Sequence, residues 1–202
     1  MATVLELETP QGGARAHLEP VENARALVVL GHGAAGSVGA PDLVAASAAA
    51  RAAGAAVALV EQPYRVAGRR SAPPAPRLDA AWVAVVEQLR AGPLAGLPLI
   101  AGGRSSGGRV ACRTAAATGA AGVLCLAFPL EPPRGRPSRA PELDAVTVPV
   151  LVVQGARDSF GMPAAGATRT VVEVPGDHRL RSDPGAVGAA VGDWLRGLLG
   201  AG

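Results

Sequence analysis

The apolar positions along the chain fall into short segments whose spacing predicts a β-sheet. Apolar and polar residues alternate over Thr3–Glu8 and again over Arg15–Glu19, which is typical of two antiparallel strands. Six continuous apolar runs follow, at 26–30, 56–60, 97–101, 122–127, 148–153 and 170–174. Runs of this length are typical of strands buried on both faces. We therefore expect about eight strands in one sheet.

Helical patterns lie between these runs. After Asp79, apolar residues recur at i, i+3, i+4 and i+7, the spacing of one helix face, at Trp82, Val85, Val86 and Leu89. The last helix is expected to be capped by Ser182 or Asp183, to have Pro184 in its first turn and to end at Gly200. Its predicted inward-facing residues are Val187, Val191, Trp194, Leu195 and Leu198. Strands that alternate with helices pair in parallel through right-handed crossovers. The pattern predicts one α/β domain over residues 1–202, with a mostly parallel sheet and helices on both faces.

Composition narrows the class of protein. Apolar residues make up 49% of the 202 residues and charged residues 17%, which is ordinary globular usage and argues against disorder. The net charge is +3 and the basic residues are scattered. Five aromatic residues are too few for the stacking platforms of single-strand binders, so nucleic acid is not an expected partner. There is no apolar leader or membrane-length run, and Cys112 and Cys125 sit in apolar segments like buried thiols, so we expect a soluble cytoplasmic protein.

The most informative motif follows the run at 97–101. Gly103-Arg104-Ser105-Ser106-Gly107 is a G-x-S-x-G sequence between a predicted strand and a predicted helix. A strand that turns directly into a helix strains the residue at the apex, and glycines beside it let the two elements approach. Ser105 is therefore predicted to be an exposed nucleophile.

A serine hydroxyl needs a base and an orienting acid to act as a nucleophile at neutral pH. Asp158 follows the run at 148–153, and His178 follows the run at 170–174. In open α/β sheets the ligand site lies beyond the carboxyl ends of the strands, where all three residues fall. We therefore predict a triad of Ser105, Asp158 and His178, in preference to the alternatives His32, Asp144, Asp177 and Asp183.

The glycine-rich segment 31–36, GHGAAG, matches the dinucleotide fingerprint G-x-G-x-x-G. The helix that should begin within these glycines is delayed by Gly39 and Pro41, which argues against a pyrophosphate site. The same loop can supply a backbone amide to an oxyanion. We therefore predict an oxyanion hole made by the amides of Ala34 and Ser106, with Ala35 as the alternative donor on the loop.

Three further side chains are candidates for holding substrate. Tyr64 and Arg65 follow a predicted strand end, and Arg104 flanks the nucleophile, so a carboxylate on the substrate could be bound there by a guanidinium fork. Structural ion pairing, with Glu61 for example, is the alternative use of these arginines. The segment between Phe128 and Val148 is too short and too rich in proline to form a helical lid, which predicts an open, shallow site. No metal-binding or Walker motif is present, so we expect no metal and no cofactor.

Five segments together resemble a known superfamily. They are GHGAAG at 31–36, EQPYR at 61–65, GGRSSGGR at 102–109, QGARD at 154–158 and PGDH at 175–178. Over nearly its whole length the chain resembles a minimal α/β-hydrolase of the dienelactone-hydrolase-like branch, and especially the KANL/Tex-type domains. The order serine, acid, histidine is the order of α/β-hydrolases. Dienelactone hydrolases proper use a cysteine nucleophile where this chain has Ser105, so their substrate is not implied.

The expected function is that of a serine hydrolase acting on a small ester, thioester or lactone through an acyl-enzyme. One alternative is an interaction module that keeps the fold without efficient turnover, which the resemblance to KANL/Tex-type domains leaves open. A lesser alternative is dinucleotide binding through GHGAAG. The substrate, the pathway and the oligomeric state do not follow from the sequence.

Overall fold

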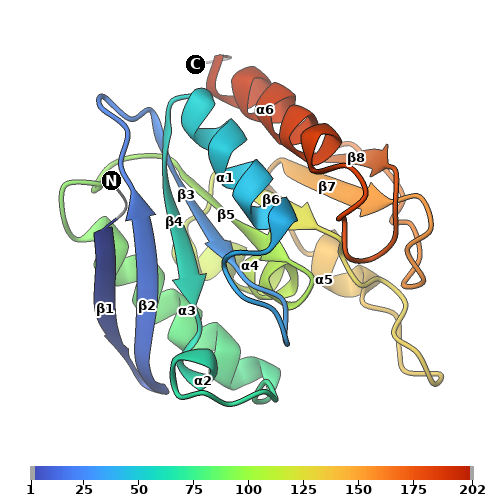
Figure 1. The fold of residues 1–202 in the computed structure, drawn as a ribbon, viewed down its shortest axis with the longest axis horizontal. Helices are drawn as coiled ribbons and strands as arrows, with labels where there is room; N and C mark the ends of the chain where they lie inside the picture. Colours follow the sequence, from blue (N-terminus) through green and yellow to red (C-terminus); the bar gives the residue numbers. More distant parts are fainter. Residues whose placement is uncertain (1–2, 201–202) are drawn as a thin grey trace.

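One eight-stranded sheet forms the centre of the molecule in the computed structural model, which describes residues 3–200 (Figure 1). Its strand order is β1-β2-β4-β3-β5-β6-β7-β8. β2 pairs antiparallel with both β1 and β4, and the remaining neighbours, from β4 through β3 to β8, pair in parallel. The strands are β1 (Thr3–Thr9), β2 (Gly12–Glu19), β3 (Ala26–Gly31), β4 (Ala55–Glu61), β5 (Leu99–Arg104), β6 (Gly122–Leu126), β7 (Val150–Gly155) and β8 (Arg169–Val174). The expected α/β class and strand number are confirmed.

Helices cover both faces of the sheet, as the alternating pattern predicts. The helices are α1 (Pro41–Ala52), α2 (Pro63–Val66), α3 (Ala75–Arg90), α4 (Ser106–Thr118), α5 (Ala140–Asp144) and α6 (Pro184–Gly200). α1 and α6 lie side by side on one face, and α3, α4 and α5 lie on the other (Figure 1). Each face therefore has its own apolar core, one around Leu43 and Leu195 and the other around Trp82 and Leu143.

Strand burial follows the sequence prediction except at one edge. β3, β6 and β7 are buried along their whole length, as continuous apolar runs predict. β8 was expected to be buried in the same way, but most of its residues are partly or fully exposed. This part of the prediction is wrong because β8 is the last strand of the sheet, with β7 as its only neighbour.

Two helices differ in detail from their predicted form. α3 begins at Ala75, before Asp79, because Pro76 is accepted in the first turn, where the backbone amide has no helical partner. α6 is capped by Asp183, whose Oδ1 accepts a hydrogen bond from the amide of Ala186 at 2.9 Å. Val187, Val191 and Leu195 of α6 are fully buried, whereas Trp194 and Leu198, also predicted to face inward, are only partly covered.

The connection between β6 and β7 leaves the carboxyl edge of the sheet uncovered. Its single helix, the five-residue α5, packs beside α4 rather than over the strand ends. The expected absence of a lid domain is confirmed for the described residues. Within residues 3–200, none of the helices is long and apolar enough to cross a bilayer.

Candidate active site

Ser105 lies at the sharp turn between β5 and α4. Its backbone has φ 50° and ψ −106°, a strained conformation for a residue with a side chain. The flanking glycines permit this turn, because a Cβ atom on either Gly103 or Gly107 would lie 2.3 Å from the carbonyl oxygen of Gly31 in β3. The close approach of β5, α4 and β3 therefore requires glycine at both positions.

His178 and Asp158 meet Ser105 at the carboxyl ends of the strands. Nε2 of His178 lies 3.0 Å from Oγ of Ser105, and Nδ1 of His178 lies 2.8 Å from Oδ2 of Asp158. The Asp158 side chain is 1% exposed and the His178 side chain 20% exposed. The three residues predicted as a triad thus form one hydrogen-bonded chain, with the carboxylate inside and the hydroxyl at its outer end.

The carboxylate of Asp158 is held by two further hydrogen bonds. Gln154 Nε2 donates to Oδ2 at 2.8 Å, and the amide of Phe160 donates to Oδ1 at 2.9 Å. Gln154 is fully buried, and its Nε2 also lies 3.0 Å from the carbonyl oxygen of Phe128 and 2.9 Å from that of Gly161, so its two hydrogens are shared among three acceptors. The ring of Phe160 packs on the ring of His178 with centroids 4.5 Å apart. The acid and the imidazole are therefore fixed before any ligand arrives.

The loop after β3 is braced by two aromatic side chains. Nε2 of His32 accepts from the amide of Gln62 at 3.1 Å, so Nδ1 carries the proton and donates to the carbonyl of Gly33 at 2.8 Å. Burial lowers the pKa of His32, which keeps this ring neutral. The hydroxyl of Tyr64 donates to the carbonyl of Ala34 at 2.8 Å. His32 therefore supports the loop rather than rivalling His178.

The predicted oxyanion residues belong to the start of α4 and to the loop after β3. Ser106 is the first residue of α4, so its amide has no acceptor within the helix and lies at the positive end of the helix dipole. Ala34 is on the braced loop, next to Gly33, where an added Cβ atom would lie 3.8 Å from the Cβ of Ser105. The loop after β3 and the start of α4 thus approach each other at Ser105.

Arg104 and Tyr64 have structural partners. Nε of Arg104 lies 2.9 Å from Oδ2 of Asp42, which is fully buried at the start of α1, and its Nη2 donates to the carbonyl of His178 at 2.8 Å. Arg104 is therefore an ion-paired residue, although its partner is Asp42 and not the suggested Glu61. Tyr64 is 6% exposed, and its hydroxyl donates its hydrogen bond to the carbonyl of Ala34. A direct substrate contact of either residue stays a prediction.

Arg65 is partly exposed and is not paired with Glu61 either. Glu61 Oε1 lies 2.6 Å from Nε2 of His17, and within the described residues the Arg65 guanidinium donates only to the carbonyl of Arg69. The guanidinium of Arg65 lines a pocket of about 570 Å³ together with Arg104. Of the three predicted substrate-binding residues, Arg65 is thus the one whose charge has no carboxylate partner within the described residues.

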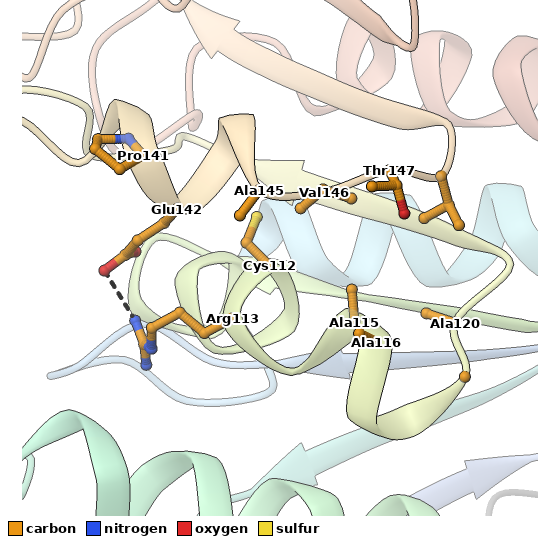
Figure 2. A pocket seen from close by; sticks show the side chains of 12 residues that line it. Cys112, Arg113, Ala115, Ala116, Ala120, Pro141, Glu142, Ala145, Val146 and Thr147 are labelled. Atoms are coloured by element: carbon orange, nitrogen blue, oxygen red, sulfur yellow. Dashed lines mark hydrogen bonds and ion pairs between the residues drawn. The ribbon is translucent and has the colours of Figure 1, made fainter.

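A second pocket, of about 480 Å³, lies between α4 and α5, away from this site (Figure 2). It is lined mainly by small apolar residues. Its one thiol, Cys112, is buried, with Sγ 3.6 Å from Sγ of Cys125. The hydrogen bond to Cys112 and burial raise the pKa of Cys125 well above its ordinary value, so the thiolate is disfavoured.

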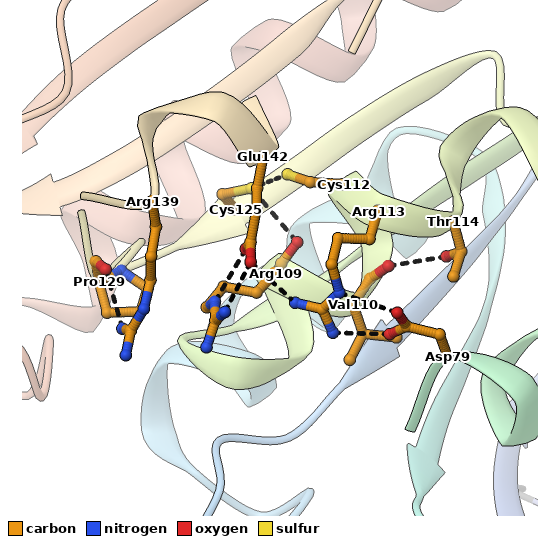
Figure 3. Close-up of polar contacts among 11 residues, drawn as sticks. Asp79, Arg109, Val110, Cys112, Arg113, Thr114, Cys125, Pro129, Arg139 and Glu142 are labelled. Carbon is orange, nitrogen blue, oxygen red and sulfur yellow. Dashed lines mark hydrogen bonds and ion pairs between the residues drawn. The ribbon is translucent and has the colours of Figure 1, made fainter. Parts of the chain in front are cut away.

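An ion-pair network beside that pocket ties α4 to its neighbours (Figure 3). Arg109 donates two hydrogen bonds to Glu142 of α5, at 2.6 and 2.8 Å. Arg113 donates two to Asp79 of α3, at 2.6 and 2.9 Å, and a longer one to Glu142. We call these four side chains the α4 network. The two guanidinium groups are thus paired with the two carboxylates, which is typical of a structural role.

Sequence reasoning missed several residues near Ser105. Gln154 stood in the quoted QGARD segment, but only the fold shows its amide on Asp158. Arg179 is the first residue after His178 and Arg181 the third, and both line the same pocket as Arg65; their closeness to His178 in the sequence could have been noticed. Asp42 carried no signal, because nothing in its local sequence points to Arg104. Within residues 3–200, no group of three or more histidine, cysteine, aspartate and glutamate residues is placed to hold a metal ion.

Comparison with known proteins places this geometry in context. The model of the Alpha/beta hydrolase domain family matches residues 24–180. No curated protein sequence matches the chain. A serine hydrolase without a lid from Xanthomonas campestris has 24% identity and a TM-score of 0.77, with 96% of this chain and 95% of that one covered. Est1E from Butyrivibrio proteoclasticus has 16% identity and a TM-score of 0.79, with 98% and 99% covered.

A dienelactone hydrolase from Anabaena variabilis has the same fold, at 18% identity and a TM-score of 0.76, with 96% of this chain and 95% of that one covered. The family model confirms the resemblance to α/β-hydrolases, and these structures share the fold; the resemblance to the dienelactone-hydrolase-like branch stays a prediction. The closer resemblance to KANL/Tex-type domains stays a prediction.

Proposed function

The chain belongs to the alpha/beta hydrolase domain family, and on that premise we propose that it is a serine hydrolase that cleaves small esters, thioesters or lactones. The observation that carries the proposal is the hydrogen-bonded chain from Ser105 Oγ through His178 to Asp158, with distances of 3.0 and 2.8 Å. These contacts are within the range required for proton transfer and for orientation of the imidazole.

In the proposed reaction, Ser105 Oγ attacks the acyl carbonyl while Nε2 of His178 takes its proton. Asp158 holds the proton on Nδ1, which leaves Nε2 free to act as the base, and stabilises the imidazolium that forms. The amides of Ala34 and Ser106 bind the oxyanion. His178 then returns the proton to the leaving group, and water hydrolyses the acyl-enzyme by the same steps.

The open edge of the sheet supports small or flexible substrates. The β6–β7 connection has no element that could enclose a long acyl chain, so such a chain would stay in contact with water. A strong preference for long-chain over short-chain esters would contradict this part of the proposal.

The first test is labelling with a fluorophosphonate probe, followed by peptide mass spectrometry. We expect modification at Ser105 alone, and none in the Ser105→Ala variant. The matched control is Ser106→Ala, which keeps the nucleophile and the backbone amide of residue 106. If a folded sample is not labelled, the protein does not activate Ser105 and the proposal fails.

The same test separates the proposal from an interaction module with an idle triad. The dinucleotide alternative is disfavoured because α1 begins at Pro41, five residues beyond Gly36, so its amides do not meet the glycine turn. Saturable binding of NAD in a titration would revive it.

A further inference from the structure

The pocket of about 570 Å³ that contains Arg65 adjoins the proposed catalytic residues. Three of its lining residues are chain neighbours of site residues: Ala35 follows Ala34, Arg104 precedes Ser105, and Arg179 follows His178. Arg104 also donates to the carbonyl of His178, which fixes one wall against the imidazole loop. The pocket is therefore walled by the segments that carry the site residues, although Ser105 and His178 do not line it themselves.

The pocket carries an excess of positive charge. Its charged lining residues are Arg65, Arg104, Arg179, Arg181 and Asp42. Arg104 is neutralised by the fully buried Asp42, at 2.9 Å. No carboxylate within the described residues lies within ion-pair distance of the other three guanidinium groups. Three positive charges therefore remain available to a ligand.

The backbone that carries these arginines is anchored. Leu180, between Arg179 and Arg181, is fully buried in the core, with φ 49° and its amide bonded to the carbonyl of Asp177 at 3.1 Å. Both neighbouring arginines are exposed. Arg65 follows the buried Tyr64, which is held by its hydrogen bond to Ala34. The arginines therefore stand on fixed backbone, which lowers the ordering cost of ligand binding.

An open site has little apolar surface with which to hold a small acyl group. The binding energy of a charged group elsewhere on the substrate can take the place of these apolar contacts and can position the carbonyl at the nucleophile. One carboxylate is matched by one guanidinium fork, which would leave two of the three charges unpaired. A phosphate monoester or a diphosphate carries two or more charges and has enough oxygens to accept from several arginines.

We propose that Arg65, Arg179 and Arg181 form a subsite for a phosphate-bearing part of the acyl substrate. This inference rests on the proposed hydrolase function and adds the substrate class: an ester or thioester whose phosphate group lies beside the scissile carbonyl. A phosphate bound there holds the substrate on the open edge of the sheet without a lid.

The test is calorimetric titration of the full chain with inorganic pyrophosphate at low ionic strength. We expect saturable binding, weakened tenfold or more in Arg179→Gln/Arg181→Gln and also weakened in Arg65→Gln. The matched control is Arg134→Gln/Arg136→Gln, which removes the same charge from two exposed positions outside the pocket and should bind like the unmodified protein. Circular dichroism verifies that each variant is folded.

Three results would overturn the inference. They are no saturable binding of pyrophosphate, equal loss of binding in the control variant, and equal binding of succinate, which would make the subsite one for dicarboxylates. Calorimetry does not depend on turnover. Pyrophosphate binding without labelling of Ser105 would therefore support the anion site and reject the hydrolase, while labelling without pyrophosphate binding would reject only the subsite.

Discussion

The α4 network and the pocket beside Ser105 are both rich in arginine, but they differ in how the charges are paired. In the α4 network, Arg109 and Arg113 are held by Glu142 and Asp79 at 2.6 to 2.9 Å (Figure 3). In the pocket, three of the four arginines have no such partner within the described residues. The same residue type thus fastens helices together in one place and is left free for a ligand in the other.

The two regions also lie in different parts of the fold, in keeping with the different pairing of their arginines. The α4 network joins three helices of one layer, α3, α4 and α5. The pocket is lined by residues that follow the carboxyl ends of strands, where α/β sheets bind ligands. Like charges that lie close together without a partner repel one another, and a bound anion relieves that repulsion. Exposed arginines elsewhere, such as Arg134 and Arg136, also lack a carboxylate partner within residues 3–200, so it is the gathering of three unpaired guanidinium groups in one pocket that sets this region apart.

The largest expected effect concerns catalysis at the strand ends. Asp158→Asn keeps the shape of the side chain but favours the wrong tautomer of His178, so we expect kcat to fall by about 10⁴-fold. Ester hydrolysis is the measurement, with thermal unfolding as the control for folding. A kcat within tenfold of the unmodified protein would show that Asp158 does not orient the imidazole.

The next effect concerns stability and belongs to the α4 network. Glu142→Gln removes the charge shared by Arg109 and Arg113, and we expect the free energy of unfolding to fall by about 1–3 kcal/mol, because the network is only partly buried. Urea denaturation measures it. The control is Asp193→Asn, whose exposed pair with Arg196 should contribute less than about 0.5 kcal/mol. Equal effects at the two sites would contradict a structural role for the network.

The pH dependence of stability sharpens the same point. Burial alone would raise the pKa of Glu142, but the hydrogen bonds and charges of Arg109 and Arg113 lower it below the ordinary value of 4.5. A carboxylate whose pKa is lower in the folded state stabilises the protein at every pH above its unfolded-state pKa. This contribution is lost as the pH falls through the folded-state pKa. We therefore expect the free energy of unfolding to decline below about pH 4.5, and to decline less steeply in the Glu142→Gln variant.

The smallest expected effect is on the stability of the pocket variants. Arg179→Gln/Arg181→Gln removes exposed charges that have no carboxylate partner, so we expect the free energy of unfolding to change by no more than about 0.5 kcal/mol. Urea denaturation in the absence of phosphate is the measurement. A decrease in the free energy of unfolding as large as that of Glu142→Gln would show that the pocket arginines are structural as well.

Much of the fold could be predicted from the sequence because burial dominates it. The apolar runs and glycine turns are local signals, and they located the strands and placed Ser105 at the start of a helix. The order Ser105, Asp158, His178 could be predicted for the same reason, since each residue follows its own apolar run. The partners Arg104–Asp42 and Gln154–Asp158 could not, because pairing depends on how the loops and side chains fold in space. The exposure of β8 follows from its place in the strand order, which its own sequence does not encode.

The contact between Tyr64 and Ala34 has a practical consequence. Tyr64 is the only tyrosine in the chain, and its hydroxyl is hydrogen-bonded to the loop beside Ser105. Burial raises the pKa of Tyr64, so the phenol keeps its proton through the neutral pH range. A single fluorine-labelled tyrosine would give one resonance in an NMR spectrum, and that resonance would report the state of the loop without any mutation. The protein therefore contains its own spectroscopic reporter for ligand binding at this edge.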